Sequence, residues 1–166
     1  MALPFPAEPV CATMLGTRMR PVGELAAYLL RRGERLRIKA RGGSMMPFLW
    51  DGDVVLVTPT DGRQIVVGDV ICYETPPGRL FLHRVIERNR DRFVAKGDAL
   101  AFRDVIDRAQ LLGKVVTVER HGKVRRLDTV AARRRNRAIA AISPMLPRLL
   151  SLAAGLRRLR RAAFRG

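Results

Sequence analysis

The sequence predicts a mainly β protein, a β barrel or meander with a short helix before it and a basic helical segment after it. Between residues 35 and 128, short apolar stretches alternate with turn residues, as expected for successive strands. Residues 22–32 combine helix-forming residues with an apolar repeat, and the chain beyond residue 128 is rich in Ala, Leu and Arg. We therefore expect a leader and short helix at 1–34, a β domain at 35–128 and a basic tail at 129–166.

The first predicted elements are a helix and a strand that follow an irregular leader, residues 1–20. The helix runs from Val22 to Arg32 and ends at Gly33, because glycine commonly terminates helices. Residues 35–40 alternate basic and apolar side chains with a period of two, which is typical of a half-buried strand.

Five further strands are predicted in the β domain. Each is a short apolar stretch, and turn residues such as Asp61-Gly62, Gly68-Asp69 and Pro76-Pro77-Gly78 separate them. These strands cover residues 53–57, 69–74, 80–87, 92–96 and 111–120.

The tail carries most of the charge. The formal net charge is +17, and residues 129–166 contain ten arginines and no acidic residue. Leu149, Leu152, Leu156 and Leu159 recur at spacings of three and four, which predicts a basic amphipathic helix. We interpret the tail as a peripheral anchor on an anionic membrane surface. The alternatives are a short or re-entrant membrane insertion of residues 138–156 and a helix that packs on the β domain.

Residue counts argue against a metal enzyme and a secretory signal. The chain has only two histidines, and neither Cys11 nor Cys72 has the spacing of a metal site, so we predict no cofactor, no metal and plain packing roles for the cysteines. Residues 1–20 contain three prolines and lack an uninterrupted apolar core behind a basic start. We therefore expect contact with the cytoplasmic face of a bacterial-type membrane.

Three motifs in the β domain carry the candidate chemistry. The first is Gly42-Gly43-Ser44-Met45-Met46-Pro47, followed by Gly-Asp pairs at 52–53 and 68–69. The second is Leu82-His83-Arg84-Val85, and the third is Lys96-Gly97-Asp98 with Asp104 six residues further on. A serine hydroxyl becomes nucleophilic when a neighbouring base removes its proton, and neutral imidazole can do so near neutral pH.

This ordered set resembles the signal peptidase I family over about residues 39–117. That family carries Ser-Met-x-Pro, Gly-Asp turns, a strand that bears the base and a late Gly-Asp segment. The resemblance implies a β fold like that of signal peptidases and LexA-type self-cleaving repressors, and serine endopeptidase activity. Because His83 stands where the usual bacterial members have lysine, the similarity is to the His-type branch of archaea, the endoplasmic reticulum and spore formers.

The resemblance implies a role for each motif residue. Ser44 is the expected nucleophile, His83 the base and Asp104 the carboxylate that holds the imidazole, with Asp107 as the fallback. The expected structural pair is Arg84 with Asp98. The Gly43 and Ser44 amides are the expected oxyanion donors, within an oxyanion and substrate-binding set of Gly42, Gly43, Met45 and Pro47.

Three features depart from the family pattern. Gly42 replaces a serine that can add an oxyanion donor, and Ala99-Leu100 follows Gly-Asp where the family tends to have Asn. The apolar stretch before Ser44 covers only nine residues and contains Glu24, so the usual membrane anchor is missing there.

The expected substrate is an extended peptide with small residues before the cut, in a leader or signal-type segment or in the protein itself. Two rival functions stay open. One is a LexA-like self-cleaving or nucleic-acid-associated regulator, and the other is a non-catalytic peptide-binding module.

Overall fold

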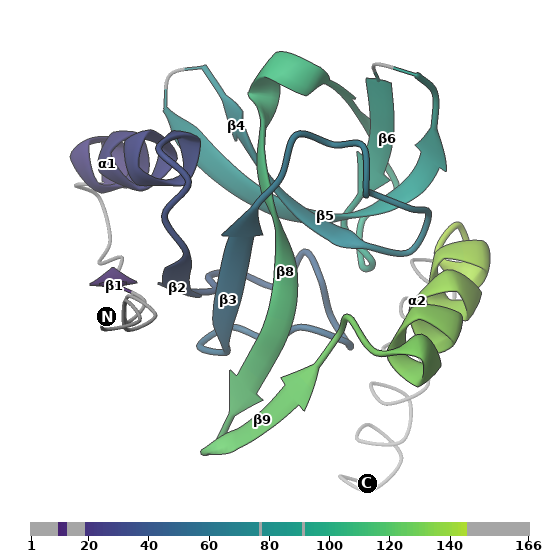
Figure 1. Cartoon of the computed structure of the whole chain (residues 1–166). Helices are drawn as coiled ribbons and strands as arrows, with labels where there is room; N and C mark the ends of the chain where they lie inside the picture. The colour runs from purple at the N-terminus through teal and green to yellow at the C-terminus, as the bar shows by residue number, and fades with distance from the viewer. Residues whose placement is uncertain (1–9, 13–18, 77, 91, 146–166) are drawn as a thin grey trace, which may run out of the picture.

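The computed structural model describes residues 10–12, 19–76, 78–90 and 92–145 (Figure 1). The elements in chain order are β1 (Val10–Ala12), α1 (Met19–Arg31), β2 (Leu36–Lys39), β3 (Val54–Pro59), β4 (Val70–Thr75), β5 (Arg79–Arg88), β6 (Arg92–Lys96), β7 (Asp104–Asp107), the 3₁₀ turn η1 (Arg108–Gln110), β8 (Leu111–Arg120), β9 (Lys123–Arg126) and α2 (Val130–Ile142). The chain is mainly β, as predicted, with one helix on the N-terminal side and one on the C-terminal side.

The strands form one open sheet in the order β1-β2-β3-β8-β4-β5-β6-β7, with β9 paired to β8. Neighbours run antiparallel except β1 and β2, which are parallel. The described strands do not close, so the barrel form of the prediction is wrong. A simple meander is also wrong, because β8 returns across the sheet to lie between β3 and β4.

The predicted helix and all six predicted strands are present, with ends within three residues of those expected. Helix α1 ends as predicted, because Gly33 adopts a φ of 90° and the amides of Gly33 and Glu34 donate to the carbonyls of Leu30 and Leu29 at 3.0 and 3.1 Å. The unpredicted strands are β1, β7 and β9. Strand β9 exposes every side chain and β7 buries only Ile106, so neither carries a clear alternating apolar pattern.

The two faces of the β4–β5 hairpin lie in different apolar cores. Cys72 and Leu82 belong to the core that includes α1, whereas Tyr73 and Val85 belong to a second core with β6 and β7. Because side chains alternate along a strand, His83 and Arg84 emerge on opposite faces of β5. This alternation separates the two polar groups that matter most for the site.

Helix α2 packs on the β domain. The Thr129 hydroxyl accepts from the Ala132 amide at 3.2 Å and caps its start. Its buried side chains are Ala132, Asn136, Ile139 and Ala140, which form one face. The predicted amphipathic stretch at 149–163 and most of 138–156 lie outside the described residues. Within the part of the chain that is described, no helix has the length and apolar character needed to cross a membrane.

Candidate active site

Ser44 and His83 line the same groove, which has a volume of about 680 Å³. One wall is formed by the end of β2 and the loop after it, residues 38–45, and the other by residues 78–83 at the start of β5. Ser44 is half-buried, while His83 is only 2% exposed. The two groups that the sequence predicts to react therefore share one accessible space.

The loop that carries Ser44 is fixed by the segment after β6. The Ser44 carbonyl accepts a hydrogen bond from the Ala99 amide at 2.9 Å. A Cβ atom at Gly97 would lie 2.6 Å from that carbonyl oxygen, so only glycine allows the two segments to approach. The segment that follows β6 thus positions Ser44 through backbone contacts.

The glycines before Ser44 differ in their availability as oxyanion donors. The Gly42 amide donates to Asp51 Oδ1 at 2.8 Å, so it adds no donor to the predicted pair, although Gly42 itself lines the groove. The Gly43 and Ser44 amides donate no hydrogen bond to any described residue, and both residues line the groove. These two amides can therefore bind a carbonyl oxygen of a substrate.

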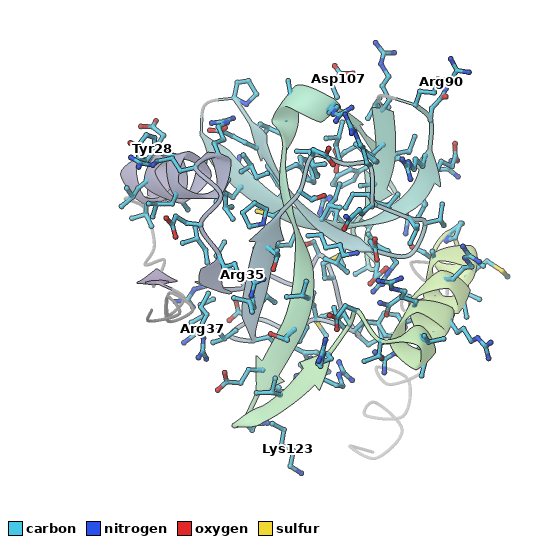
Figure 2. All side chains as sticks on the ribbon, viewed as in Figure 1. Tyr28, Arg35, Arg37, Arg90, Asp107 and Lys123 are labelled. Atoms are coloured by element: carbon cyan, nitrogen blue, oxygen red, sulfur yellow. The ribbon has the colours of Figure 1, made fainter. Side chains whose placement is uncertain are left out.

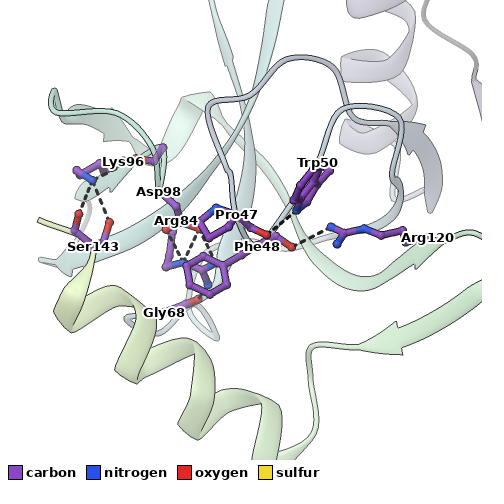
Figure 3. Close-up of polar contacts among 10 residues, drawn as sticks. Pro47, Phe48, Trp50, Gly68, Arg84, Lys96, Asp98, Arg120 and Ser143 are labelled. Atoms are coloured by element: carbon purple, nitrogen blue, oxygen red, sulfur yellow. Dashed lines mark hydrogen bonds and ion pairs between the residues drawn. The ribbon is translucent and has the colours of Figure 1, made fainter. Parts of the chain in front are cut away.

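The other predicted substrate-binding residues divide in the same way. Met45 lines the groove and is also buried in the apolar core that includes α1. Pro47 does not line the groove, which corrects the prediction, and its carbonyl accepts from Trp50 Nε1 at 2.7 Å (Figure 3). Leu100, one of the departures from the family pattern, forms part of the groove wall.

The imidazole of His83 is held by Asp104, the first residue of β7. Its Nδ1 lies 2.8 Å from Asp104 Oδ2. Burial lowers the pKa of His83, although the hydrogen bond to Asp104 opposes this change. Neutral imidazole that donates from Nδ1 has Nε2 free to accept a proton, so the base-competent tautomer is favoured.

Tyr73 on β4 is a third member of this group that the sequence analysis missed. Its hydroxyl donates to Asp104 Oδ2 at 2.7 Å and lies 2.8 Å from His83 Nδ1. Burial raises the pKa of Tyr73, and the hydrogen bond to Asp104 raises it further, so the hydroxyl keeps its proton. A charged carboxylate is a stronger acceptor than imidazole, so the single hydroxyl hydrogen goes to Asp104. This leaves Nδ1 of His83 as a donor.

Asp107, the fallback for Asp104, lies outside this group. Its carboxylate pairs with Arg92 Nε at 2.9 Å and it precedes the η1 turn, where its side chain is exposed (Figure 2). The spacing from Lys96-Gly97-Asp98 therefore predicted which of the two aspartates contacts His83.

Arg84 and Asp98 form the predicted structural pair, and both are buried. Arg84 Nε and Nη2 donate to Asp98 at 2.9 and 2.8 Å, and Nη1 donates to the Gly68 carbonyl at 2.9 Å (Figure 3). The guanidinium carbon also lies 5.6 Å from the ring centre of Phe48 in the serine loop. Arg84 thus joins the serine loop, the Gly68 turn and the segment that holds the Ser44 carbonyl.

A buried lysine joins this region to α2, which no sequence pattern indicated. Lys96 Nζ donates to the carbonyl and hydroxyl of Ser143 at 2.8 and 3.0 Å (Figure 3). Burial lowers the pKa of Lys96, while the charge of Asp98 opposes this. Helix α2 also contacts the Gly68 turn directly. A Cβ at Gly68 would lie 2.7 Å from the Asn136 carbonyl carbon.

Comparison with known proteins finds no family model and no curated protein that matches this chain. The chemistry of the site is therefore argued from its own residues. Cys72 also lines the groove, but burial raises the pKa of its thiol to about 12, so it is not a competing nucleophile at neutral pH. No three His, Cys, Asp or Glu side chains in the described residues are grouped to hold a metal.

Proposed function

We propose that this chain is a serine endopeptidase of the signal-peptidase type, of the His-dependent branch, that cleaves a leader or signal-type segment. The observation that carries the proposal is that Ser44 and His83 line one groove while Asp104 holds His83 Nδ1 at 2.8 Å. In Ser-His-Asp hydrolases a carboxylate holds one imidazole nitrogen and the other takes the serine proton. Here the carboxylate contact is present, and Ser44 lines the same groove as the imidazole. The ordered motifs between residues 39 and 117 support the same function and a LexA/signal-peptidase-like fold.

In this mechanism Ser44 Oγ attacks the carbonyl carbon of the scissile bond while His83 Nε2 takes the hydroxyl proton. The Gly43 and Ser44 amides stabilise the oxyanion that forms. The imidazolium, stabilised by Asp104, then donates its proton to the leaving amine and the peptide bond breaks. Water, deprotonated by the same imidazole, hydrolyses the acyl-Ser44 ester and restores the enzyme.

The experiment is a cleavage assay on a library of leader peptides, read by mass spectrometry. We expect cleavage by the parent protein and none by Ser44→Ala or His83→Ala. The matched control is His121→Asn, because His121 is the other histidine of the chain and lies exposed in the β8–β9 turn with a φ of 49°, which asparagine tolerates. Equal cleavage by His83→Ala and the parent would contradict the mechanism.

Glycine at position 42 favours one rival, a peptide-binding module without catalysis. Because Gly42 has no side-chain hydroxyl, the oxyanion site has one donor fewer than the family pattern suggests. Loss of one such donor slows catalysis by about 10²–10³-fold. Peptide binding that survives in Ser44→Ala, with no cleavage by the parent after long incubation, would support this rival.

We also propose that the tail brings the enzyme to an anionic membrane surface. Exposed arginines on α2 support this, because each basic residue near such a surface contributes about 1 kcal/mol to binding; they are Arg133, Arg134, Arg135 and Arg137. Vesicles that contain phosphatidylserine should sediment the full chain more strongly than a chain ending at Met145. Equal sedimentation of both would contradict a role for residues 146–166.

A further inference from the structure

All the charged side chains that line the groove are basic. Its lining includes three basic side chains, Lys39, Arg41 and Arg79, and no carboxylate. Most of the remaining lining is apolar or glycine, including Ile38, Leu49, Leu80 and Leu82. A peptide in the groove therefore meets apolar surface together with positive charge.

The two walls each contribute a cation. Arg79 lies at the start of β5, and its guanidinium carbon is 5.5 Å from the ring centre of Phe81. A guanidinium placed over an aromatic ring keeps its in-plane N–H groups for a carboxylate. On the opposite wall, Lys39 ends β2 and makes no hydrogen bond or ion pair with any described residue. Both cations are therefore available to a ligand.

Three described carboxylates lie against residues that line the groove. Asp51 accepts the Gly42 amide, and Asp104 is engaged by His83 and Tyr73. Glu24 lies against Gly78 at the end of the groove, where a Cβ on Gly78 would be 2.9 Å from the Glu24 side chain. None of the three acids lines the groove itself.

We propose that the groove selects peptides that carry Asp or Glu within a few residues of the cut, next to small apolar side chains. This inference rests on the proposed endopeptidase function and names its substrate class. It also disfavours the chain's own tail as a substrate, because residues 129–166 contain ten arginines and no acid.

The test uses sets of peptides that differ only by Glu, Gln or Lys at each position flanking the cut. We expect kcat/KM to be about two- to five-fold higher for Glu than for Gln at a responsive position, and lower again for Lys, as for a partly exposed ion pair. The preference should shrink at high salt, because screening weakens exposed charge pairs.

The matched variants are Arg79→Glu and Arg90→Glu, which change the net charge equally. Arg90 lies in the β5–β6 turn, at the opposite end of the molecule from β2 and its Arg37 (Figure 2). We expect Arg79→Glu to remove or reverse the preference, Arg79→Gln to weaken it, and Arg90→Glu to leave it unchanged.

The outcomes separate this inference from the function on which it rests. Cleavage of no peptide in any set would count against the endopeptidase itself. Cleavage of Glu, Gln and Lys peptides at equal rates would overturn the acidic preference alone. The inference would also be overturned if Arg79→Glu and Arg90→Glu changed the preference for Glu peptides equally, since the preference would then reflect only the overall charge.

Discussion

His83 and Arg84 are neighbours on one strand, yet they enter two different kinds of polar environment. His83 contacts the carboxylate of Asp104, which is one-third exposed. Arg84 meets Asp98, and the two side chains are 3% and 0% exposed. Both carboxylates are held at 2.8 Å, so distance does not distinguish the pairs.

The difference lies in what each pair can do. A partly exposed carboxylate beside a neutral imidazole can stabilise the imidazolium that forms when the ring takes up a proton, as general base catalysis requires. A buried ion pair in which all three guanidinium nitrogens donate hydrogen bonds has no such freedom, and it holds backbone segments in place. Changes on the His83 side should therefore affect activity more than stability, and changes on the Arg84 side should do the reverse.

The largest effect is expected for Asp104→Asn. The neutral amide of asparagine is a weaker acceptor for the Nδ1 hydrogen than a carboxylate. It therefore does not hold the imidazole in the tautomer whose Nε2 is free to accept the Ser44 proton. We expect kcat/KM to fall by about 10⁴-fold, as when the aspartate of a Ser-His-Asp group is replaced. Because Asp104 is partly exposed, the midpoint of urea unfolding should change little.

Asp107→Asn is the control for this variant, since Asp107 belongs to the same strand and its carboxylate pairs only at the surface with Arg92. It should keep parental activity. A comparable loss in both variants would mean that β7 as a whole, rather than the Asp104 carboxylate, supports cleavage.

The next effect is expected for Arg84→Met, and it should appear in stability. This substitution leaves Asp98 as an uncompensated buried charge, which costs about 3–5 kcal/mol. Equilibrium unfolding in urea measures the loss, with activity compared at equal folded fraction.

The double variant Arg84→Met/Asp98→Leu sharpens this test. Removal of both charges should recover much of the stability, because an apolar pair of similar volume is often neutral relative to a buried ion pair. If Arg84→Met alone lost activity without losing stability, Arg84 would belong to the reacting group and the contrast with His83 would fail.

The residues that sequence analysis predicted correctly depend on local patterns or on an ordered motif. The stop at Gly33 and the alternation at 35–40 are local, and both elements appear in the structure. The motif order predicted that Asp104 would meet His83 and that Asp98 would meet Arg84, and both contacts are present. These predictions needed no knowledge of how the strands pair.

The residues that were missed depend on strand register or on contacts across long separations. Tyr73 joins His83 because Ile71 pairs with His83 and Tyr73 pairs with Phe81, so alternate residues share a face. Lys96 meets Ser143 across 47 positions, and only the docking of α2 brings them together. The register of 69–74 against 80–87 would have been the signal for Tyr73.

Lys96→Met tests whether the contact between Lys96 and Ser143 affects the site that contains Ser44 and His83. The variant removes the donor for the Ser143 carbonyl and hydroxyl, which should cost about 1–3 kcal/mol. We expect hydrogen exchange to rise in α2 while kcat/KM changes less than about two-fold, because the Ser44 carbonyl is held by the Ala99 backbone rather than by the lysine. A ten-fold loss of activity at full folded fraction would show that the two regions are coupled.

The smallest effect is expected for Tyr73→Phe, and pH reveals it. Only neutral imidazole can accept the Ser44 proton, so kcat/KM should rise with pH through the pKa of His83. Burial lowers that pKa, and the midpoint of the rise in the parent should therefore lie below pH 6.5, the usual value for histidine. Without the Tyr73 hydroxyl, Asp104 Oδ2 accepts a hydrogen bond from His83 only. The carboxylate then stabilises imidazolium more strongly, which raises the pKa of His83.

The expected shift in Tyr73→Phe is up to about one pH unit toward higher pH, the equivalent of one hydrogen bond. The folding stability of the parent should also rise with pH, because the pKa of His83 is lower in the folded state. Because the unfolded chain binds a proton below about pH 6.5 that folded His83 resists, this contribution is complete above pH 6.5 and is lost as pH falls. A lower rate with an unchanged pH profile would assign Tyr73 a packing role only. A profile shifted toward lower pH would mean that the Tyr73 oxygen stabilises the imidazolium by accepting its Nδ1 hydrogen, and would contradict the expected effect through Asp104.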